Sequence, residues 1–124
     1  MTEPEDTEFS LTSLEARAKE GDIEAQYEMS ARHAIGRGVE LDDDVAVEWL
    51  QKAAASGHSL AQNNLGARYY SGDGVDKDLK RAYRCFFKAA NQGDRKAGKN
   101  LDSITRQLTE KDLETLRSEM GETH

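Results

Sequence analysis

Few side chains in this sequence could carry chemistry, and they do not stand together. The only histidines are His33, His58 and His124, and none lies at metal-ligand spacing from a second ligand. Cys85 is the single cysteine, which rules out an internal disulfide. No histidine is placed beside it in the sequence to activate its sulfur. These residues predict neither a metal site nor a nucleophile.

Aspartates are the other candidates for metal binding, and they gather ahead of two predicted helices. The spacing of Asp73, Asp76 and Asp78 superficially resembles a calcium loop, but the remaining ligands and the closing glutamate are missing. These residues, like 42–44, fit helix capping better, because a carboxylate accepts hydrogen bonds from the N–H groups of a first turn. The chain also lacks a phosphate loop, a nucleophile elbow and a paired-carboxylate motif. We therefore predict a protein that is not an enzyme and has no metal or cofactor.

The elements that carry these residues repeat along the chain. Gly21, Gly57 and Gly93 are 36 residues apart, twice over, and the segments 21–56 and 57–92 align without a gap. Thirteen columns of this alignment are identical: Gly21/Gly57, Ala25/Ala61, Gln26/Gln62, Ala31/Ala67, Arg32/Arg68, Gly36/Gly72, Gly38/Gly74, Val39/Val75, Asp42/Asp78, Ala46/Ala82, Lys52/Lys88, Ala53/Ala89 and Ala54/Ala90. A fixed period of this length predicts stacked helical units, which usually present a groove to another protein.

Each full unit reads as a helix, a double-glycine loop and a second helix. The loops need backbone freedom at Gly38 and Gly74, where we expect positive φ angles. Trp49, on the second helix of the first unit, is expected to be largely buried between the two full repeats. The predicted first helices span 22–35, 59–71 and 94–108, and the predicted last helix spans 110–120.

The two ends of the chain differ from the repeats. Thr12 and Glu15 form a capping box that opens a short helix, and Thr109 caps the last helix. The predicted organisation is a disordered acidic tail (1–11) followed by a single solenoid (12–124). That solenoid comprises a cap helix (12–20), two repeats (21–56 and 57–92), and a partial repeat with a C-terminal cap (93–124).

Charge and composition exclude two kinds of partner. The 124 residues carry 24 acids and 17 bases, a net charge of −7, whereas nucleic-acid binding needs a cluster of Lys and Arg. No apolar run approaches the roughly 18 residues of a membrane helix. The first ten residues lack the basic start and apolar stretch of a secretory signal. We predict a cytoplasmic protein that binds neither nucleic acid nor membrane.

The segment 61–93, AQNNLGARYYSGDGVDKDLKRAYRCFFKAANQG, resembles the Sel-one-like repeat (SLR) of the tetratricopeptide-like α-solenoids. The first repeat fits with Met29 for Leu, Ser30 for Gly and His33 for Tyr. The resemblance implies an all-α fold, a right-handed α/α superhelix of antiparallel helix pairs with terminal capping helices. It also implies an adaptor or scaffold for protein complexes. Some cysteine-rich members are linked to β-lactam binding, but this chain lacks those cysteines.

In solenoids of this type the first helix of each pair lines the concave face, which is where we expect a partner to bind. This face would run from acidic, through polar and aromatic, to basic. Asn side chains suit a peptide backbone, and Lys or Arg suits an acidic side chain or a C-terminal carboxylate. The predicted partner-binding residues are Tyr27, Glu28, Asn63, Asn64, Tyr70, Lys96, Lys99, Asn100 and Arg106.

We accordingly predict a non-catalytic module that binds a protein or peptide, and is itself a monomer or a weak oligomer. Two alternatives remain. One is a small-ligand-binding or hydrolytic protein of the β-lactam-binding type, which would show a deep pocket with convergent polar groups. The other is a self-associating structural protein whose apolar ends stack.

Overall fold

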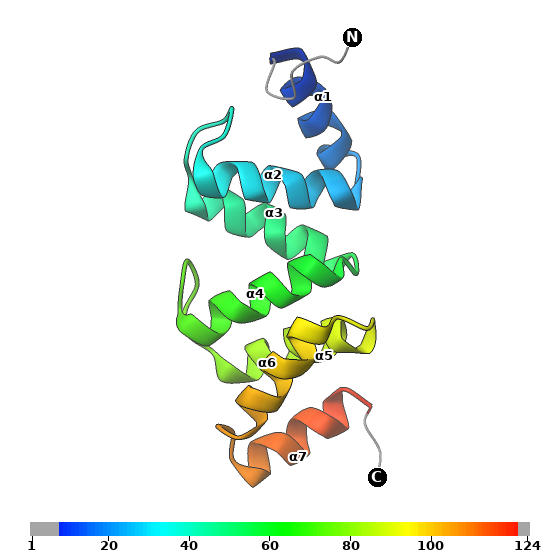
Figure 1. The fold of residues 1–124 in the computed structure, drawn as a ribbon, viewed down its shortest axis with the longest axis vertical. Coiled ribbons are helices and arrows are strands. Elements are labelled where there is room, and N and C mark those ends of the chain that lie inside the picture. The colour runs from blue at the N-terminus through cyan, green and yellow to red at the C-terminus, as the bar shows by residue number, and fades with distance from the viewer. Residues whose placement is uncertain (1–7, 122–124) are drawn as a thin grey trace.

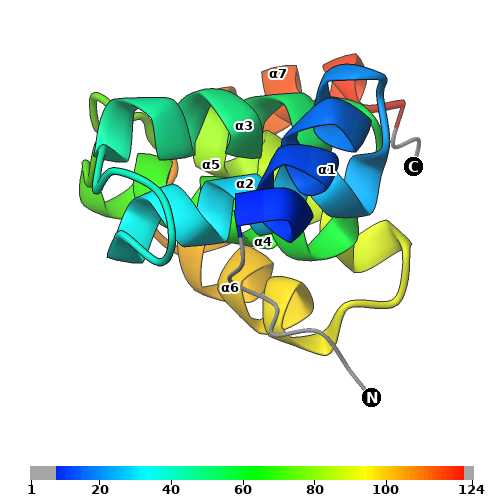
Figure 2. The same ribbon diagram turned by 90° about the horizontal axis from the view of Figure 1, so that it is seen from above.

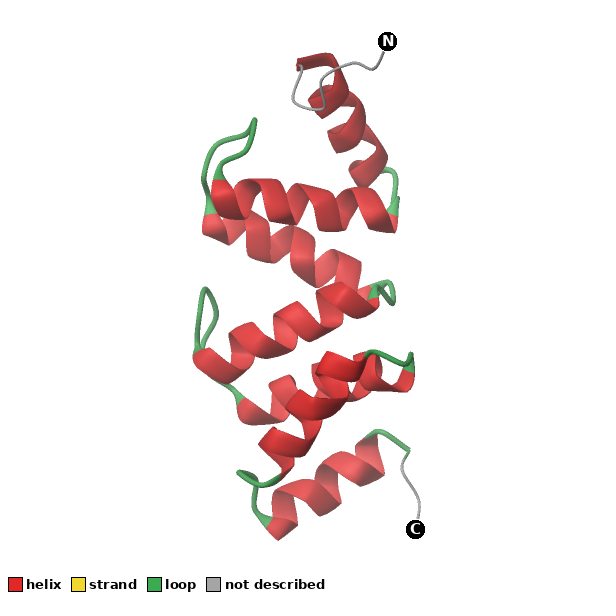
Figure 3. Ribbon diagram, viewed as in Figure 1, coloured by secondary structure: helices red, strands yellow, loops and turns green. Residues whose placement is uncertain are grey.

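The computed structural model describes residues 8–121, and this part of the chain is entirely helices and connecting loops (Figure 3). Seven helices follow one another in the described range: α1 (Glu8–Lys19), α2 (Ile23–Ile35), α3 (Asp43–Ala55), α4 (Ser59–Ser71), α5 (Leu79–Asn91), α6 (Arg95–Thr105) and α7 (Glu110–Glu119). Successive helices pack antiparallel, and α4 lies midway along the elongated stack (Figure 1). Seen from above, α2, α4 and α6 form one layer and α3, α5 and α7 the other (Figure 2).

Side-chain caps mark where the helices from α2 to α7 begin. Asp42 and Asp78 accept hydrogen bonds from N–H groups in the first turns of α3 and α5, which confirms the predicted capping role. Thr109 Oγ1 accepts from the N–H of Asp112 at 3.0 Å, so the predicted cap of α7 is confirmed as well. Each cap satisfies an N–H group that the helix itself leaves without a carbonyl partner.

Small residues let the helices approach closely. Ala46, Ala53, Ala82 and Ala89 are fully buried and line the centre of the two full repeats. Two larger buried side chains, Gln26 and Gln62, donate from Nε2 to the carbonyl oxygens of Ala18 and Ala54 at 3.1 Å. Each glutamine thereby ties a first helix to the end of the helix before it.

The double-glycine loops have the predicted backbone geometry. Gly38 and Gly74 both have φ of 75°, a left-handed conformation that other residues adopt only with strain. A Cβ at Gly38 would lie 2.7 Å from Leu11 of α1. At Gly74 it would collide with the side chains of Asp43 and Arg68. Each loop therefore packs tightly against neighbouring elements.

The ends of four helices differ from the prediction. Helix α2 begins one residue later than predicted, because Asp22 is its N-cap. The first helix begins at Glu8, so Thr12 lies inside a helix and does not open one. The predicted tail (1–11) therefore ends too late, because residues 8–11 are helical; residues 1–7 lie outside the described part of the chain. Helix α6 ends at Thr105 and α7 at Glu119, both short of the predicted ends at 108 and 120.

Trp49 does not lie between the two full repeats. It is half-buried and packs on the cluster of Leu14, Ala18, Ala25 and Met29, which belongs to α1 and α2. Lys52 Nζ lies 4.6 Å from the centre of its ring, which fits a cation–π contact. The indole therefore fastens α1 to the first repeat, and the predicted position of Trp49 between the two full repeats was wrong.

Candidate interaction surface

The nine predicted residues do lie on one layer of the molecule. We call the outward surface of α2, α4 and α6 the first-helix face. Helix α2 carries Tyr27 and Glu28, α4 carries Asn63, Asn64 and Tyr70, and α6 carries Lys96, Lys99 and Asn100. Arg106 follows α6 directly as its C-cap residue. Of the four large hydrophobic residues exposed in the described chain, Ile35, Leu60 and Tyr70 also lie on these helices.

Polar side chains on this face bond to one another across neighbouring helices. Asn64 Nδ2 donates to the Tyr27 hydroxyl oxygen at 2.9 Å, joining α4 to α2. Asn100 Nδ2 donates to Asn63 Oδ1 at 3.0 Å, joining α6 to α4. Both bonds connect residues 37 apart, so the same inter-repeat contact occurs twice. These side chains are held in fixed positions rather than left free on the surface.

Tyr70 is bonded in the same way, to a residue that the sequence analysis missed. Gln107 Nε2 donates to the Tyr70 hydroxyl oxygen at 2.7 Å, again across 37 residues. Gln107 was counted inside the predicted helix 94–108, but it follows α6 in the turn before α7. Tyr70 and Gln107 are as far apart in sequence as Tyr27 and Asn64. The bond between them could therefore have been predicted once the offset between neighbouring helices was known.

His58 is the second residue that sequence reasoning missed. Its Nδ1 accepts from the N–H of Ala61 at 3.1 Å and caps α4, while its Nε2 lies 3.1 Å from Glu24 Oε1. Its ring also stacks on Tyr27, with centroids 4.5 Å apart. Because Nδ1 accepts, the proton sits on Nε2 and points at the Glu24 carboxylate. In the alignment of the two repeats, His58 occupies the position of Asp22, which caps α2. This equivalence could have predicted that His58 caps α4.

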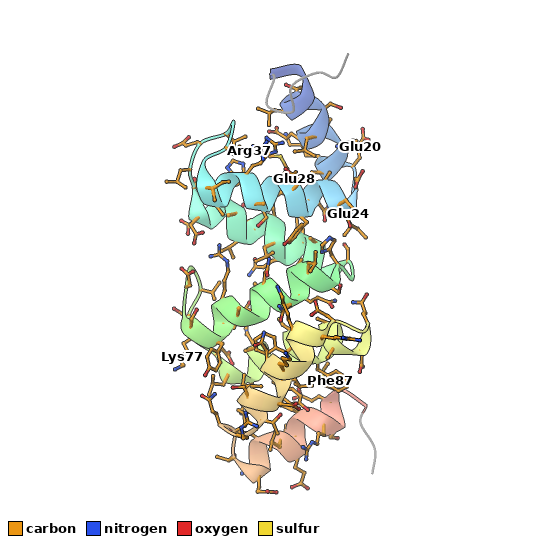
Figure 4. All side chains as sticks on the ribbon, in the orientation of Figure 1. Glu20, Glu24, Glu28, Arg37, Lys77 and Phe87 are labelled. Atoms are coloured by element: carbon orange, nitrogen blue, oxygen red, sulfur yellow. The ribbon has the colours of Figure 1, made fainter. Side chains whose placement is uncertain are left out.

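The acidic residues on α2 have partners within the molecule, whereas the basic residues on and just after α6 have none among the described residues. Glu24 and Glu28, one turn apart on α2 (Figure 4), contact His58 and Arg32 respectively. On α6, by contrast, Lys96 and Lys99 are exposed and pair with no acid among the described residues. Arg106 is likewise exposed and unpaired within residues 8–121. The basic side chains are therefore free to meet an acidic group from outside.

A small cleft of about 250 Å³ opens between α2 and α4. Its lining consists of small and apolar side chains together with a polar rim: Tyr27, Ser30, Ala31, Ala34, Leu50, Asn64, Ala67 and Arg68. Arg68 is fixed there by Asp43, with Nη1–Oδ2 at 2.9 Å and Nη2–Oδ1 at 3.0 Å. The hydrogen bonds from this guanidinium lower the pKa of the Asp43 carboxyl.

Groups with catalytic potential do not converge on this face. Cys85 on α5 is half-buried, and desolvation raises the pKa of its thiol to about 11. Across residues 8–121, no three His, Cys, Asp or Glu side chains come together in a way that could hold a metal ion. His33 Nδ1 lies 2.9 Å from the carbonyl oxygen of Glu40, a contact that ties the first loop to α2. His124 lies outside the described residues.

None of the helices in the described range is both long and apolar enough to cross a membrane. A stack of antiparallel helix pairs with a 36-residue period instead defines a helix-repeat protein, an α-solenoid. A family model described as the Sel1 repeat matches residues 23–58 and 59–94. The chain therefore belongs to the Sel1 repeat family, which confirms the resemblance seen in the sequence.

Two solved structures place the fold within this family. The crystal structure of a Sel1 repeat protein from Oxalobacter formigenes is similar with a TM-score of 0.71 and 31% identity, over 87% of this chain and 97% of that one. A protective antigen of uropathogenic Escherichia coli strains, which displays an SLR fold, is similar with a TM-score of 0.79 and 31% identity. That match covers 87% of this chain and only 23% of the antigen. No curated protein matches the chain in sequence.

Proposed function

We propose that this protein is a non-catalytic interaction module that binds a protein or peptide segment across its first-helix face. The acidic side chains or the C-terminal carboxylate of that segment would meet Lys96, Lys99 and Arg106. The observation that carries the proposal is that these three basic side chains, at one end of an ordered polar face, are exposed and have no acidic partner within residues 8–121. Guanidinium and ammonium groups of this kind form strong charge-assisted bonds with carboxylates.

The centre of the face offers what a peptide backbone needs. Asn64 uses Nδ2 to bond Tyr27, which leaves its Oδ1 as an acceptor, and Asn63 uses Oδ1, which leaves its Nδ2 as a donor. One donor and one acceptor are the complement of a peptide group. The internal bonds hold both amides in place before binding, which lowers the entropy cost of ordering them. The α2–α4 cleft offers room for an apolar side chain of the same segment.

No catalytic step is included in this proposal. Burial raises the pKa of the Cys85 thiol to about 11, which keeps it protonated at neutral pH and a weak nucleophile. The exposed aromatic and basic groups of the first-helix face are instead the types that dominate binding energies at protein interfaces.

The proposal is tested by selecting peptides from a displayed random library on the immobilised protein. Selected sequences should be rich in Asp and Glu or should need a free C-terminal carboxylate. The double variant Lys96→Glu/Lys99→Glu should weaken their binding by about 10-fold or more for each charge reversed, with helical circular dichroism unchanged. Lys88→Glu is the matched control, because Lys88 is exposed on α5 in the other layer and pairs with no acid in the described chain.

Two results would contradict the proposal. One is a selection that yields no acidic preference. The other is a set of peptides that bind the double variant as well as the wild type but lose affinity for the Lys88→Glu control. Arg84 makes a poorer control than Lys88, because its guanidinium bonds Glu119 of α7 at 2.9 Å and helps to hold the last helix in place.

A further inference from the structure

Equivalent positions on the three first helices carry an acid, an apolar residue and a base. Glu24 on α2, Leu60 on α4 and Lys96 on α6 are 36 residues apart and occupy the first turn of each helix. All three are exposed: the side chain of Glu24 is 84% accessible and Leu60 is 52% accessible. One turn later, the same three helices carry Tyr27, Asn63 and Lys99.

This order is self-complementary under two-fold rotation. An axis lying in the surface and parallel to α4 places α2 of one copy over α6 of the other. The rotation leaves positions along the helix axes unchanged, so the first turn of each helix faces the first turn of the helix opposite it in the second copy. Glu24 then meets Lys96 of the second copy, Lys96 meets its Glu24, and Leu60 meets its own counterpart. Such an interface is isologous, because each copy contributes the same patch.

We propose that the first-helix face binds a second copy of this chain in a two-fold symmetric dimer. Two acid–base pairs flank an apolar centre formed by Leu60 and Tyr70, which both lie on α4 along the axis. Tyr27 faces Lys99 of the second copy, an arrangement suited to a cation–π contact. Two of the chain's exposed large hydrophobic residues are thereby removed from water.

Self-association of this kind is limited in strength and sensitive to salt. Its two charge pairs lie in solvent, where ion pairs contribute little and are screened as ionic strength rises. The dimer covers the basic residues to which we assign partner binding, so a partner would bind the monomer. The inference does not rest on the proposed function: sedimentation of the protein alone tests the dimer, while peptide selection tests the other proposal.

The test is sedimentation equilibrium on the intact protein from about 10 µM to about 1 mM, a range that brackets weak association. The wild type should pass from the monomer mass towards twice that mass, and about 1 M NaCl should reverse the change. Glu24→Lys and Lys96→Glu should each shift the midpoint at least 10-fold upwards, because each creates two like-charge contacts in its own dimer. Lys88→Glu, on the other layer, should associate like the wild type.

The decisive measurement mixes the two charge variants in equal amounts. In the mixed dimer both contacts again join an acid to a base, so the mixture should associate at least 10-fold more tightly than either variant alone. A purely structural defect would not be repaired by mixing. Glu24→Lys also loses the contact with His58, so Leu60→Asp serves as an independent variant at an exposed site and should abolish the dimer as well.

Three outcomes would overturn the inference. The first is a wild type that stays monomeric over the whole concentration range. The second is a dimer that tolerates Leu60→Asp and both charge reversals. The third is a mixture of folded Glu24→Lys and Lys96→Glu proteins that remains monomeric.

Discussion

Gly66 on α4 lies directly against Phe86 of α5, and this contact allows a quantitative prediction about the second repeat. A Cβ at Gly66 would lie 2.6 Å and 2.7 Å from Cε1 and Cδ1 of Phe86, and 3.1 Å from Cβ of Cys85. Carbon atoms in contact normally stay about 3.5–4.0 Å apart. Phe86 is almost completely buried, so its ring has no room to move aside.

The first repeat solves the same packing problem with different residues. Ser30 stands where the second repeat has Gly66, and Leu50 stands where it has Phe86. Ser30 Oγ donates to the carbonyl oxygen of Ala46 at 2.8 Å, so the extra hydroxyl is satisfied inside the core. In the first repeat, therefore, the larger residue on the first helix, Ser30, occurs together with the smaller residue on the second helix, Leu50.

The expected energies follow from this comparison. Gly66→Ser should destabilise the protein by about 1–2 kcal/mol, because overpacking costs about 1–3 kcal/mol and improved helix propensity returns only about half of one. Phe86→Leu should cost about 1–2 kcal/mol through the volume it removes. The double variant should be at least as stable as Phe86→Leu alone, which corresponds to a coupling energy of about 1–2 kcal/mol.

Urea unfolding followed by circular dichroism measures all four corners of this cycle. Gly98→Ala is the control, since a Cβ at Gly98 on α6 meets no atom within 4 Å. It should stabilise the protein by up to about 1 kcal/mol through helix propensity alone. The reasoning is refuted if the two substitutions at 66 and 86 add within about 0.5 kcal/mol, or if Gly66→Ser is as harmless as Gly98→Ala.

Three further predictions concern single groups. Gln26 Oε1 is buried with no partner among the described residues, whereas the equivalent Gln62 Oε1 accepts a hydrogen bond from Gln92 Nε2. Ser56 occupies the position equivalent to Gln92, so Ser56→Gln supplies the missing donor and should raise the free energy of unfolding, measured in urea, by about 1 kcal/mol. Hydrogen bonds from Arg68 lower the pKa of Asp43, so this ion pair stabilises the folded state above about pH 4 and the stabilisation is lost as pH falls through the folded pKa. Asp43→Asn should therefore reduce the loss of unfolding free energy in acid by less than about 1 kcal/mol. The raised pKa of Cys85, about 11, should make its alkylation at pH 8 roughly 100-fold slower in the folded than in the unfolded chain, and equal rates would contradict this.

Local features of the fold were accessible from the sequence because they depend on short-range geometry. The period set by Gly21, Gly57 and Gly93 gives the number of units, since each unit is built from the same helix–loop–helix segment. The left-handed backbone at Gly38 and Gly74 follows from residue type alone, because a loop of this kind needs φ values that only glycine adopts freely. Caps such as Asp78 follow for the same reason, since a helix start and its cap lie within four residues.

The composition of the first-helix face was also predictable, but the bonds across it were not. Periodicity places Tyr27, Asn63 and Lys99 on one side of their helices. Whether Tyr27 meets Asn63 or Asn64 depends on how far one repeat is rotated and shifted against the next. The observed offset of 37 residues pairs Tyr27 with Asn64, and that offset is a property of the stacked repeats.

The repeat unit, its glycine loops, caps such as Asp42 and Asp78, and the charge of each helix follow from the sequence, because each depends on residues within one segment of chain. Which units share a side chain depends instead on how the repeats stack. Trp49 packs on α1 instead of the following repeat, and His58 caps α4 while bonding Glu24 of the repeat before it. Both depend on how neighbouring helices are offset in space, and that offset is set by the packing of small buried residues such as Ala53 and Ala82.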